Sequence, residues 1–501
     1  MTGPVRPPLS RAVTVSTQPS SSGLETLASR VASDLAHIET PLREWVPERR
    51  ADGDKPMPDV VIVGAGLSGL SIAFGLKRQG VSRVKVIDAA LPGAEGPWVT
   101  SARMRTLRSP KTLTGPDLGV PSLTYRAWHE ASYGTESWQK LDLINRMDWM
   151  AYLIWFRRIV GLDVQNNVRL LEISDGGGHL LLGVETDGER KTIACRKIVL
   201  ATGLEGAGGL HVPDHISTAL PRDRWTHSGE LLDVAALKGK DIGIIGAAAS
   251  SFDWAVAALE EGAKSATLLA RAEEFPRTEI LDWSNFPGFL NHFADLDDQQ
   301  RYRFARRLLA FRTPPTQEMF NRANALPNFQ LVMGAPVERV AMQGDRISIG
   351  TSAQGDFVFD HLLLGTGYKV DLSRRPELAN VIGNIALWRD RFVPEAGEED
   401  GSLLSYPYLG PAFEFTEKQP GKTPFLRDIH IFNNGAVPSL GPVCNGITGL
   451  KSGVPRIVAG LSRGLFIEDA ELHYRALDGY DKRHFNPEAG LAASASRARD
   501  P

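Results

Sequence analysis

Residues 60–69 read Val60-Val61-Ile62-Val63-Gly64-Ala65-Gly66-Leu67-Ser68-Gly69. Four apolar residues lead directly into the spacing G-x-G-x-x-G, which is typical of a buried parallel strand that turns into a helix at a dinucleotide pyrophosphate. Gly64 permits the tight turn, Gly66 lets the backbone approach the phosphates, and Gly69 lets the helix pack closely on the sheet. Free N–H groups and the positive dipole end of that helix then face the phosphates.

The residues after this turn complete a βαβ unit. A helix is predicted over 70–78, and residues 84–87 predict a second strand. Asp88 ends that strand about 20 residues after Gly69, where a carboxylate accepts hydrogen bonds from ribose hydroxyls. A lone G-x-G-x-x-G also occurs as a glycine turn in other α/β proteins. Because strand, helix, second strand and acid are all in place, the sequence predicts a dinucleotide site here.

A second copy of the pattern reads Ile242-Gly243-Ile244-Ile245-Gly246-Ala247-Ala248-Ala249-Ser250-Ser251. The strand and Gly246 are kept, whereas Ala248 and Ser251 stand where the other two glycines belong. No acid ends the next predicted strand, and Arg271 follows it instead. Loss of the carboxylate and gain of a guanidinium suit a 2′-phosphate, so the pattern predicts NADP rather than NAD at this site.

Two alternatives stay open for the second site. Glu273 and Glu274 stand close to Arg271 in the sequence and offer it partners other than a phosphate. The side chains of Ala248 and Ser251 also occupy space that glycine leaves for a pyrophosphate, so a duplicated domain that has lost nicotinamide binding explains the same substitutions. A chain that binds two dinucleotides usually passes electrons between them, which makes FAD plus a nicotinamide the first hypothesis.

Composition limits the class of protein. The chain has 501 residues, of which 42% are hydrophobic and 23% charged, enough for two or three domains with substantial cores. A formal net charge of −3 gives no signature of nucleic-acid binding. The two cysteines, Cys195 and Cys444, form neither a disulfide framework nor a C-x-x-C pair, which favours the cytoplasm. We expect no membrane span and no metal site.

The two patterns predict an α/β protein with two Rossmann-like domains, the second inserted in the first. The expected boundaries are an N-terminal tail and helices over 1–57, an FAD-binding domain over 58–212 and 368–475, an NADP-binding domain over 213–367, and a C-terminal tail over 476–501. A helical, aromatic-rich insertion over 275–328 interrupts the second domain, as a roof over a substrate pocket or as plain core. Further predicted elements are one or two helices over 24–48, strands at 168–171, 180–184, 197–203, 361–367 and 429–432, and a helix over 449–465.

These features resemble those of two-dinucleotide flavoproteins. Within that group the chain is similar to the flavin-containing (class B) monooxygenases and the related N-hydroxylating monooxygenases of ornithine and lysine. The resemblance covers about residues 58–467 and rests on the paired motifs, on Asp88, and on the turns Ala201-Thr202-Gly203 and Gly365-Thr366-Gly367. It implies FAD in the first domain, NADP in the second, and Gly203 and Gly367 beside the cofactors. It also implies that NADPH reduces FAD and that bound NADP⁺ protects a flavin peroxide, which oxygenates the substrate.

The segment from Leu107 to Lys111 is similar to the stretch that faces the flavin in those families. Arg108 and Lys111 are therefore candidate catalytic groups, with a pair of solvated surface cations as the alternative. Those families place an asparagine where Arg108 stands, so the groups around the flavin differ here. The Baeyer–Villiger fingerprint F-x-G-x-x-x-H is not met before His227, because proline and aspartate replace Phe and Gly. Oxygenation at a nitrogen or sulfur is therefore favoured over ketone oxidation.

The sequence thus predicts an NADPH-dependent FAD monooxygenase, an oxidoreductase whose partners are a small molecule and oxygen. In such enzymes the cofactor performs the difficult step and the protein supplies position and a water-poor pocket. Two other functions fit the same residues. One is an FAD oxidase or reductase that does not use NADPH, and the other is a flavin-binding regulatory protein without turnover. No motif identifies the substrate or the oligomeric state.

Overall fold

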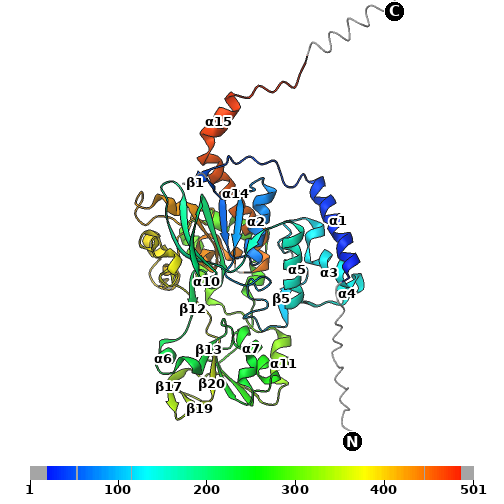
Figure 1. The fold of residues 1–501 in the computed structure, drawn as a ribbon. Helices are drawn as coiled ribbons and strands as arrows, with labels where there is room; N and C mark the ends of the chain where they lie inside the picture. The colour runs from blue at the N-terminus through cyan, green and yellow to red at the C-terminus, as the bar shows by residue number, and fades with distance from the viewer. Residues whose placement is uncertain (1–19, 52–54, 114, 445, 487–501) are drawn as a thin grey trace, which may run out of the picture.

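The computed structural model describes residues 20–51, 55–113, 115–444 and 446–486. Within these ranges the chain folds into two α/β domains, each built on a five-stranded parallel sheet. In Figure 1 the second domain, mostly green, lies below the first, and helix α15 extends from the opposite end of the molecule. The predicted tails before residue 20 and after residue 486 lie outside the described residues.

The first sheet has the strand order β22-β11-β3-β4-β7, with all neighbours parallel. The central strand β3 is the predicted apolar run Val60–Val63, and α2, Leu67–Arg78, follows it. Helix α14, Leu450–Glu468, packs on α2, where Gly75 has the methyl groups of Val458 beside it. The other strands are β4 (Val84–Ile87), β7 (Val164–Gln165), β11 (Lys197–Gly203) and β22 (Ile429–Asn433).

The second sheet repeats this arrangement. Its order is β13-β20-β14-β15-β16, again parallel throughout, and α7, Ala249–Glu260, follows its central strand as α2 follows β3. The outer strand β13 precedes the other four in the chain, whereas its counterpart β22 comes last. The strands are β13 (Trp225–His227), β14 (Asp241–Ile245), β15 (Ser265–Leu269), β16 (Phe329–Val332) and β20 (His361–Leu364).

Each domain also carries a three-stranded antiparallel sheet, which lies in the chain between β7 and β11 in the first domain and between β16 and β20 in the second. The predicted strands at 168–171 and 180–184 are confirmed and are longer than expected, and a third strand joins them. These sheets consist of β8 (Val168–Asp175), β9 (Leu180–Thr186) and β10 (Glu189–Cys195), and of β17 (Val337–Gln343), β18 (Arg346–Thr351) and β19 (Gly355–Phe359).

Two short antiparallel strands join the domains. Strand β12, Gly208–Leu210, leaves the first domain and pairs with β21, Tyr368–Val370, which returns to it. A Cβ atom at Gly208 would lie 2.0 Å from the carbonyl oxygen of Lys369, so this close pairing requires glycine. The chain therefore leaves and re-enters the first domain at one place, as expected for a nested second domain.

The insertion over 275–328 belongs to both domains. Helices α9 (Pro287–His292) and α10 (Asp298–Ala310) pack on the first domain, where Arg301 donates a hydrogen bond of 3.0 Å to the carbonyl of Ser439 and Phe293 lies against Gly441. Helix α11, Gln317–Asn324, returns to the second domain and packs on α7. The insertion therefore holds the two domains together in addition to the β12–β21 ribbon.

The remaining helices and strands surround these layers. The N-terminal prediction of one or two helices over 24–48 is met by α1 alone, which packs on α3 in an aromatic subdomain. Their bounds are α1 (Ser21–His37), β1 (Arg50–Ala51), β2 (Lys55–Pro56), β5 (Thr106–Pro110), α3 (Tyr125–Tyr133), α4 (Thr135–Lys140), β6 (Leu143–Asn145), α5 (Arg146–Ile159), α6 (Asp214–Ser217), α8 (Ile280–Trp283), α12 (Trp388–Arg391), α13 (Val437–Leu440) and α15 (Ala470–Asp478). No helix of the described ranges combines the length and apolarity that crossing a membrane requires.

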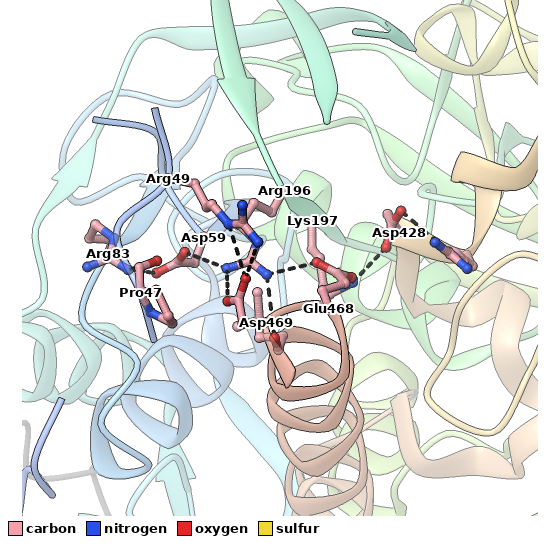
Figure 2. A network of polar contacts seen from close by, with 11 residues as sticks. Pro47, Arg49, Asp59, Arg83, Arg196, Lys197, Asp428, Glu468 and Asp469 are labelled. Atoms are coloured by element: carbon pink, nitrogen blue, oxygen red, sulfur yellow. Dashed lines mark hydrogen bonds and ion pairs between the residues drawn. The ribbon is translucent and has the colours of Figure 1, made fainter. Parts of the chain in front are cut away.

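A buried charge network closes the amino-terminal edge of the first sheet (Figure 2). Asp469, at the junction of α14 and α15, has a fully buried carboxylate that accepts hydrogen bonds from Arg49 at 2.6 Å and from Arg196 at 2.7 Å. Arg196 also contacts Asp59 and Glu468, and Lys197 bridges Glu468 and Asp428. The network lies at the amino-terminal ends of the strands, whereas the predicted cofactor turn lies at the carboxyl-terminal end of β3. We therefore assign the network to the stability of the fold and not to the site.

Candidate active site

The first glycine motif forms a turn that only glycine can make. Gly64 has φ +105°, and a Cβ atom there would lie 2.4 Å from the carbonyl oxygen of Ala201. A Cβ atom at Gly69 would lie 1.8 Å from the carbonyl oxygen of Gly64. Gly66 differs, because the nearest atom to its Cβ position is the Cα of Gly96 at 3.9 Å. Backbone atoms therefore leave no room for a side chain at Gly64 or Gly69. The space beside Gly66 is open, as the approach of a pyrophosphate requires.

Asp88 stands directly after β4 and points back to this turn. Its Oδ2 accepts a hydrogen bond of 2.7 Å from the N–H of Ala65, and its Oδ1 accepts one of 2.7 Å from the N–H of Ala90. Each carboxylate oxygen can accept a further hydrogen bond, so the oriented group remains available to a ribose. The glycine cradle and the oriented carboxylate together fit the adenosine diphosphate half of FAD.

The second motif repeats the turn, with one of its two substitutions on a cavity wall and the other fully buried. Gly246 has φ +105°, as Gly64 has, and its Cβ position lies 2.5 Å from the carbonyl oxygen of Gly365. Ala248 precedes α7 and lines a cavity, so its methyl group borders space that a ligand could occupy. Ser251 is fully buried and points at Gly365, whose Cβ position lies 1.9 Å from the serine Oγ. The packing of α7 against the sheet therefore explains Ser251 without a cofactor contact.

A cavity of about 1060 Å³ lies between the two domains. The first domain contributes residues 97–109 in part together with Gly446 and Ile447, and the second contributes the turn 245–250 and the start of α7. Gly367 lines the cavity with φ +81°, whereas Gly203, with φ +69° at the end of β11, does not. The charged lining residues are Arg103, Arg108, Arg271, Arg312, Asp253 and Glu274. Four guanidinium groups against two carboxylates favour an anionic ligand.

Arg271 lies at the rim of this cavity, just after β15. It is exposed, and it makes neither an ion pair nor a hydrogen bond with any residue of the described ranges. Neither Glu273 nor Glu274 pairs with it, which removes one of the two alternatives that the sequence left open. The guanidinium is therefore free to bind an anion at the second nucleotide motif.

The structure separates the two candidate catalytic cations. Arg108, in β5, lines the cavity. Lys111 is not among the residues of the described ranges that line the cavity. Its ammonium donates hydrogen bonds to the carbonyl of Trp138, at 2.9 Å, and to that of Leu141 at the end of α4. Lysine at a helix carboxyl end satisfies carbonyls that have no partner within the helix. Lys111 thus supports α4, and we assign it no catalytic part.

Asp253, on α7, is the group that sequence analysis missed. Its side chain is 7% exposed, lines the cavity, and lies 3.5 Å from the guanidinium of Arg108 (Nη2 to Oδ2). Burial raises the pKa of this carboxyl to about 6, and the positive charge of Arg108 opposes that rise. One signal was available, because Asp253 is the only charged residue before Glu260 in the otherwise apolar helix Ala249–Glu260.

The aromatic cluster over residues 283–304 of the insertion does not roof the cavity. Its members pack mainly on each other, and the pairs among them have ring centroids 5.4–6.4 Å apart. The cavity is instead bordered by other residues of the insertion, Phe275, Pro276, Leu309, Arg312 and Thr313. The aromatic residues in question are Trp283, Phe286, Phe289, Phe293 and Phe304, none of which belongs to the described lining.

Comparisons with known proteins agree with this geometry. The family model described as pyridine nucleotide-disulphide oxidoreductase matches residues 61–284. The chain is 40% identical over 468 residues to an FAD-dependent urate hydroxylase of Xanthomonas campestris pv. campestris, covering 90% of this chain and 97% of that protein. Among solved structures it is similar to the ornithine N-hydroxylase of Kutzneria sp. 744 in complex with reduced FAD, NADP⁺ and L-ornithine. The two structures superpose with a TM-score of 0.63 at 17% sequence identity, and the match covers 82% of this chain and 100% of that chain. The ornithine hydroxylase of Pseudomonas aeruginosa gives TM-score 0.64 at 16% identity, with the same coverage.

Proposed function

The chain belongs to the family of FAD-dependent monooxygenases that includes this urate hydroxylase, and on that premise we propose that it hydroxylates urate or a closely related planar heterocyclic anion. The cosubstrates are NADPH and dioxygen, and the flavin is FAD. One oxygen atom enters the substrate, the other leaves as water, and NADPH supplies the two electrons. Free thiols at Cys195 and Cys444 suit the reducing cytoplasm, which we propose as the compartment.

The observation that carries the substrate class is the charge of the cavity wall. Arg103, Arg108 and Arg312 face the same space, and only two carboxylates accompany the arginines there. Urate is a monoanion near neutral pH, whereas free ornithine and lysine each carry a net positive charge. A cation-rich cavity stabilises the first and repels the second. The fold is shared with amine N-hydroxylases, but the charge favours a heterocyclic anion.

When bound, FAD supplies the activation of dioxygen, and the chain supplies position and desolvation. Gly64, Gly66, Gly69 and Asp88 would hold its adenosine diphosphate half. Gly246 and Ala248 would hold the pyrophosphate of NADPH at the start of α7, with Arg271 at the 2′-phosphate. Apolar side chains such as Trp98, Met104, Leu107 and Ile447 line the end of the cavity toward the first domain and limit access of water there.

The proposed function is tested with purified, FAD-loaded protein, NADPH, oxygen and urate. We expect urate to be consumed in a one-to-one ratio with NADPH and oxygen, without accumulation of hydrogen peroxide. Ornithine and lysine, offered as amine controls, should not accelerate NADPH oxidation. Stoichiometric hydrogen peroxide with every compound tested would instead indicate the oxidase alternative. Identification of the product by mass spectrometry and NMR also tests the prediction that nitrogen or sulfur is the atom attacked.

The choice of coenzyme is tested at Arg271. Replacing Arg271 by alanine removes a charge-assisted contact to the 2′-phosphate, worth about 1.5–3 kcal/mol. We expect NADPH affinity to fall roughly tenfold to a hundredfold, with little change for NADH. Arg277, an exposed arginine of the same loop outside the cavity lining, gives the matched control Arg277→Ala. Equal losses of NADPH and NADH would show that Arg271 supports the loop rather than the phosphate.

A further inference from the structure

Arg108 and Asp253 come from different domains and meet on the wall of the cavity. Arg108 belongs to β5 of the first domain, and Asp253 belongs to the second turn of α7 in the second domain. Their closest atoms are 3.5 Å apart, which is longer than the 2.7–3.2 Å typical of a hydrogen bond. Within the described ranges neither side chain has a closer polar partner. Both groups therefore keep hydrogen-bonding capacity that faces the cavity.

A guanidinium beside a carboxylate is complementary to a planar amide. The guanidinium donates N–H groups and accepts nothing, whereas an ionised carboxylate only accepts. An amide edge presents a C=O group next to an N–H group, so it can satisfy both partners at once. Asp253 is largely withdrawn from water, with 7% of its side chain exposed against 36% for Arg108, which strengthens hydrogen bonds to its carboxylate.

We propose that Arg108 and Asp253 form an amide-binding subsite, in which Arg108 donates to the carbonyl and Asp253 accepts from the N–H of one planar amide of the ligand. Two ligands carry this chemistry. The first is a ring amide of the oxidised heterocycle, an assignment that rests on the proposed function. The second is the carboxamide of the nicotinamide ring, which requires only that NADPH binds at the second motif.

The position of the pair suits either ligand. Asp253 follows the nucleotide turn by a few residues on the same helix, and residues 246–250 line the same cavity. Arg108 lies on the first-domain side of the cavity, together with Trp98, Leu107 and Ile447. The subsite is therefore at the junction where the reacting ends of coenzyme and substrate must approach the flavin.

Protonation of Asp253 gives the subsite a defined pH dependence. Arg108 from β5, Arg146 from the start of α5, and Arg322 and Glu318 from α11 are the charged groups that face this carboxyl. Burial raises its pKa to about 6. Above that pH the charged carboxylate accepts the amide N–H, and below it the neutral carboxyl keeps only the weaker acceptor of its carbonyl oxygen. Ligand affinity through this subsite should therefore weaken as pH falls through about 6.

The test compares two isosteric variants that each remove one interdomain carboxylate. Asp253→Asn replaces the charged acceptor of the proposed subsite by a neutral amide, whose carbonyl oxygen accepts a weaker hydrogen bond and whose N–H group repels a donor. Glu260→Gln removes a carboxylate on the same helix but outside the cavity lining, which forms ion pairs of 2.9 Å with Arg105 and 3.0 Å with Arg322. FAD absorbance and thermal unfolding establish that both variants are folded and loaded. The Kd values of urate and of NADP⁺ are then measured by calorimetry at pH 7.5 and at pH 5.5, alongside KM in turnover.

We expect Asp253→Asn to lower the affinity for one of the two ligands about tenfold or more at pH 7.5, and to make the Kd of that ligand less dependent on pH than in the wild-type protein. Glu260→Gln should leave both values within about twofold. Loss of urate alone identifies the substrate ring, which N-methylated urates should reproduce in the wild-type protein. Loss of NADP⁺ alone identifies the carboxamide, which the acetylpyridine analogue of NADP⁺ should reproduce.

Two results would overturn the subsite. One is an unchanged Kd for both ligands in Asp253→Asn. The other is an equal loss of ligand affinity in Glu260→Gln, which would show that Arg108 and Asp253 act as an ion pair between the domains and not as a ligand subsite. Failure of the proposed function is distinguishable, because wild-type protein would then neither bind nor consume urate. In that case the NADP⁺ measurements alone decide whether the subsite exists.

Discussion

Replacing Asp469 by alanine is expected to lower the free energy of unfolding by about 3–5 kcal/mol. The carboxylate is fully buried and accepts hydrogen bonds from both Arg49 and Arg196, as Figure 2 shows. Arg196 is 5% exposed. When Asp469 is lost, the buried positive charge of Arg196 keeps Asp59 and Glu468 as its carboxylate partners. Breaking a buried pair by removing one partner is costly, because the other charge cannot regain its hydration.

Chemical denaturation of the FAD-loaded protein, with the midpoint and slope fitted together, measures this cost. An exposed ion pair gives the matched control. Arg339 and Asp356 lie 3.0 Å apart with 74% and 59% of their side chains exposed, so Asp356→Ala should cost less than about 1 kcal/mol. Equal effects of Asp469→Ala and Asp356→Ala would contradict the importance assigned to the buried network. Because the network is remote from the cavity, ligand affinities should change little in either variant.

The two nucleotide folds were predictable because their signals are local. An apolar run followed by spaced glycines is determined within about ten residues, and Gly64 and Gly246 adopt the same φ of +105°. The central strands, the helices after them, β4 and β11 all lie where the sequence predicts them. The strand β10 and all three strands of the second antiparallel sheet were not predicted, and the end of α14 was misplaced by a few residues, because strand and helix ends depend on tertiary packing.

The features that the sequence did not predict depend on contacts between distant residues. Arg108 and Asp253 are far apart in the chain, and nothing in either local pattern indicates that they meet. Ser251 illustrates the opposite case, since its position in the motif suggested a cofactor contact. Its side chain fills the space beside Gly365 instead, because the third position of the motif faces the sheet and not the ligand. Lys111 likewise lies in the segment that was predicted to face the flavin, but its ammonium points to the carboxyl end of α4.

Replacing Gly66 by valine should give a folded protein that is colourless, with FAD affinity reduced by more than about a hundredfold. The nearest atom to the Cβ position of Gly66 lies 3.9 Å away, so the backbone tolerates the side chain. Gly66 has φ −70° and ψ −173°, an extended conformation that valine also adopts. The added methyl groups instead occupy the space that the pyrophosphate needs, and overpacking of this kind costs about 3 kcal/mol. Flavin absorbance after desalting, with circular dichroism to verify folding, measures both properties.

The second motif provides the control, because Ala248 occupies the position that corresponds to Gly66. Ala248→Val adds a similar volume at the start of α7, so it should weaken NADPH while leaving FAD bound in stoichiometric amount. Gly69→Ala would not serve, since its Cβ atom would lie 1.8 Å from the carbonyl of Gly64 and disturb the fold itself. Retention of FAD by Gly66→Val would refute the assignment of the first motif. Loss of FAD from both valine variants would show instead that the two nucleotide sites are coupled through the interface that α7 forms with β5.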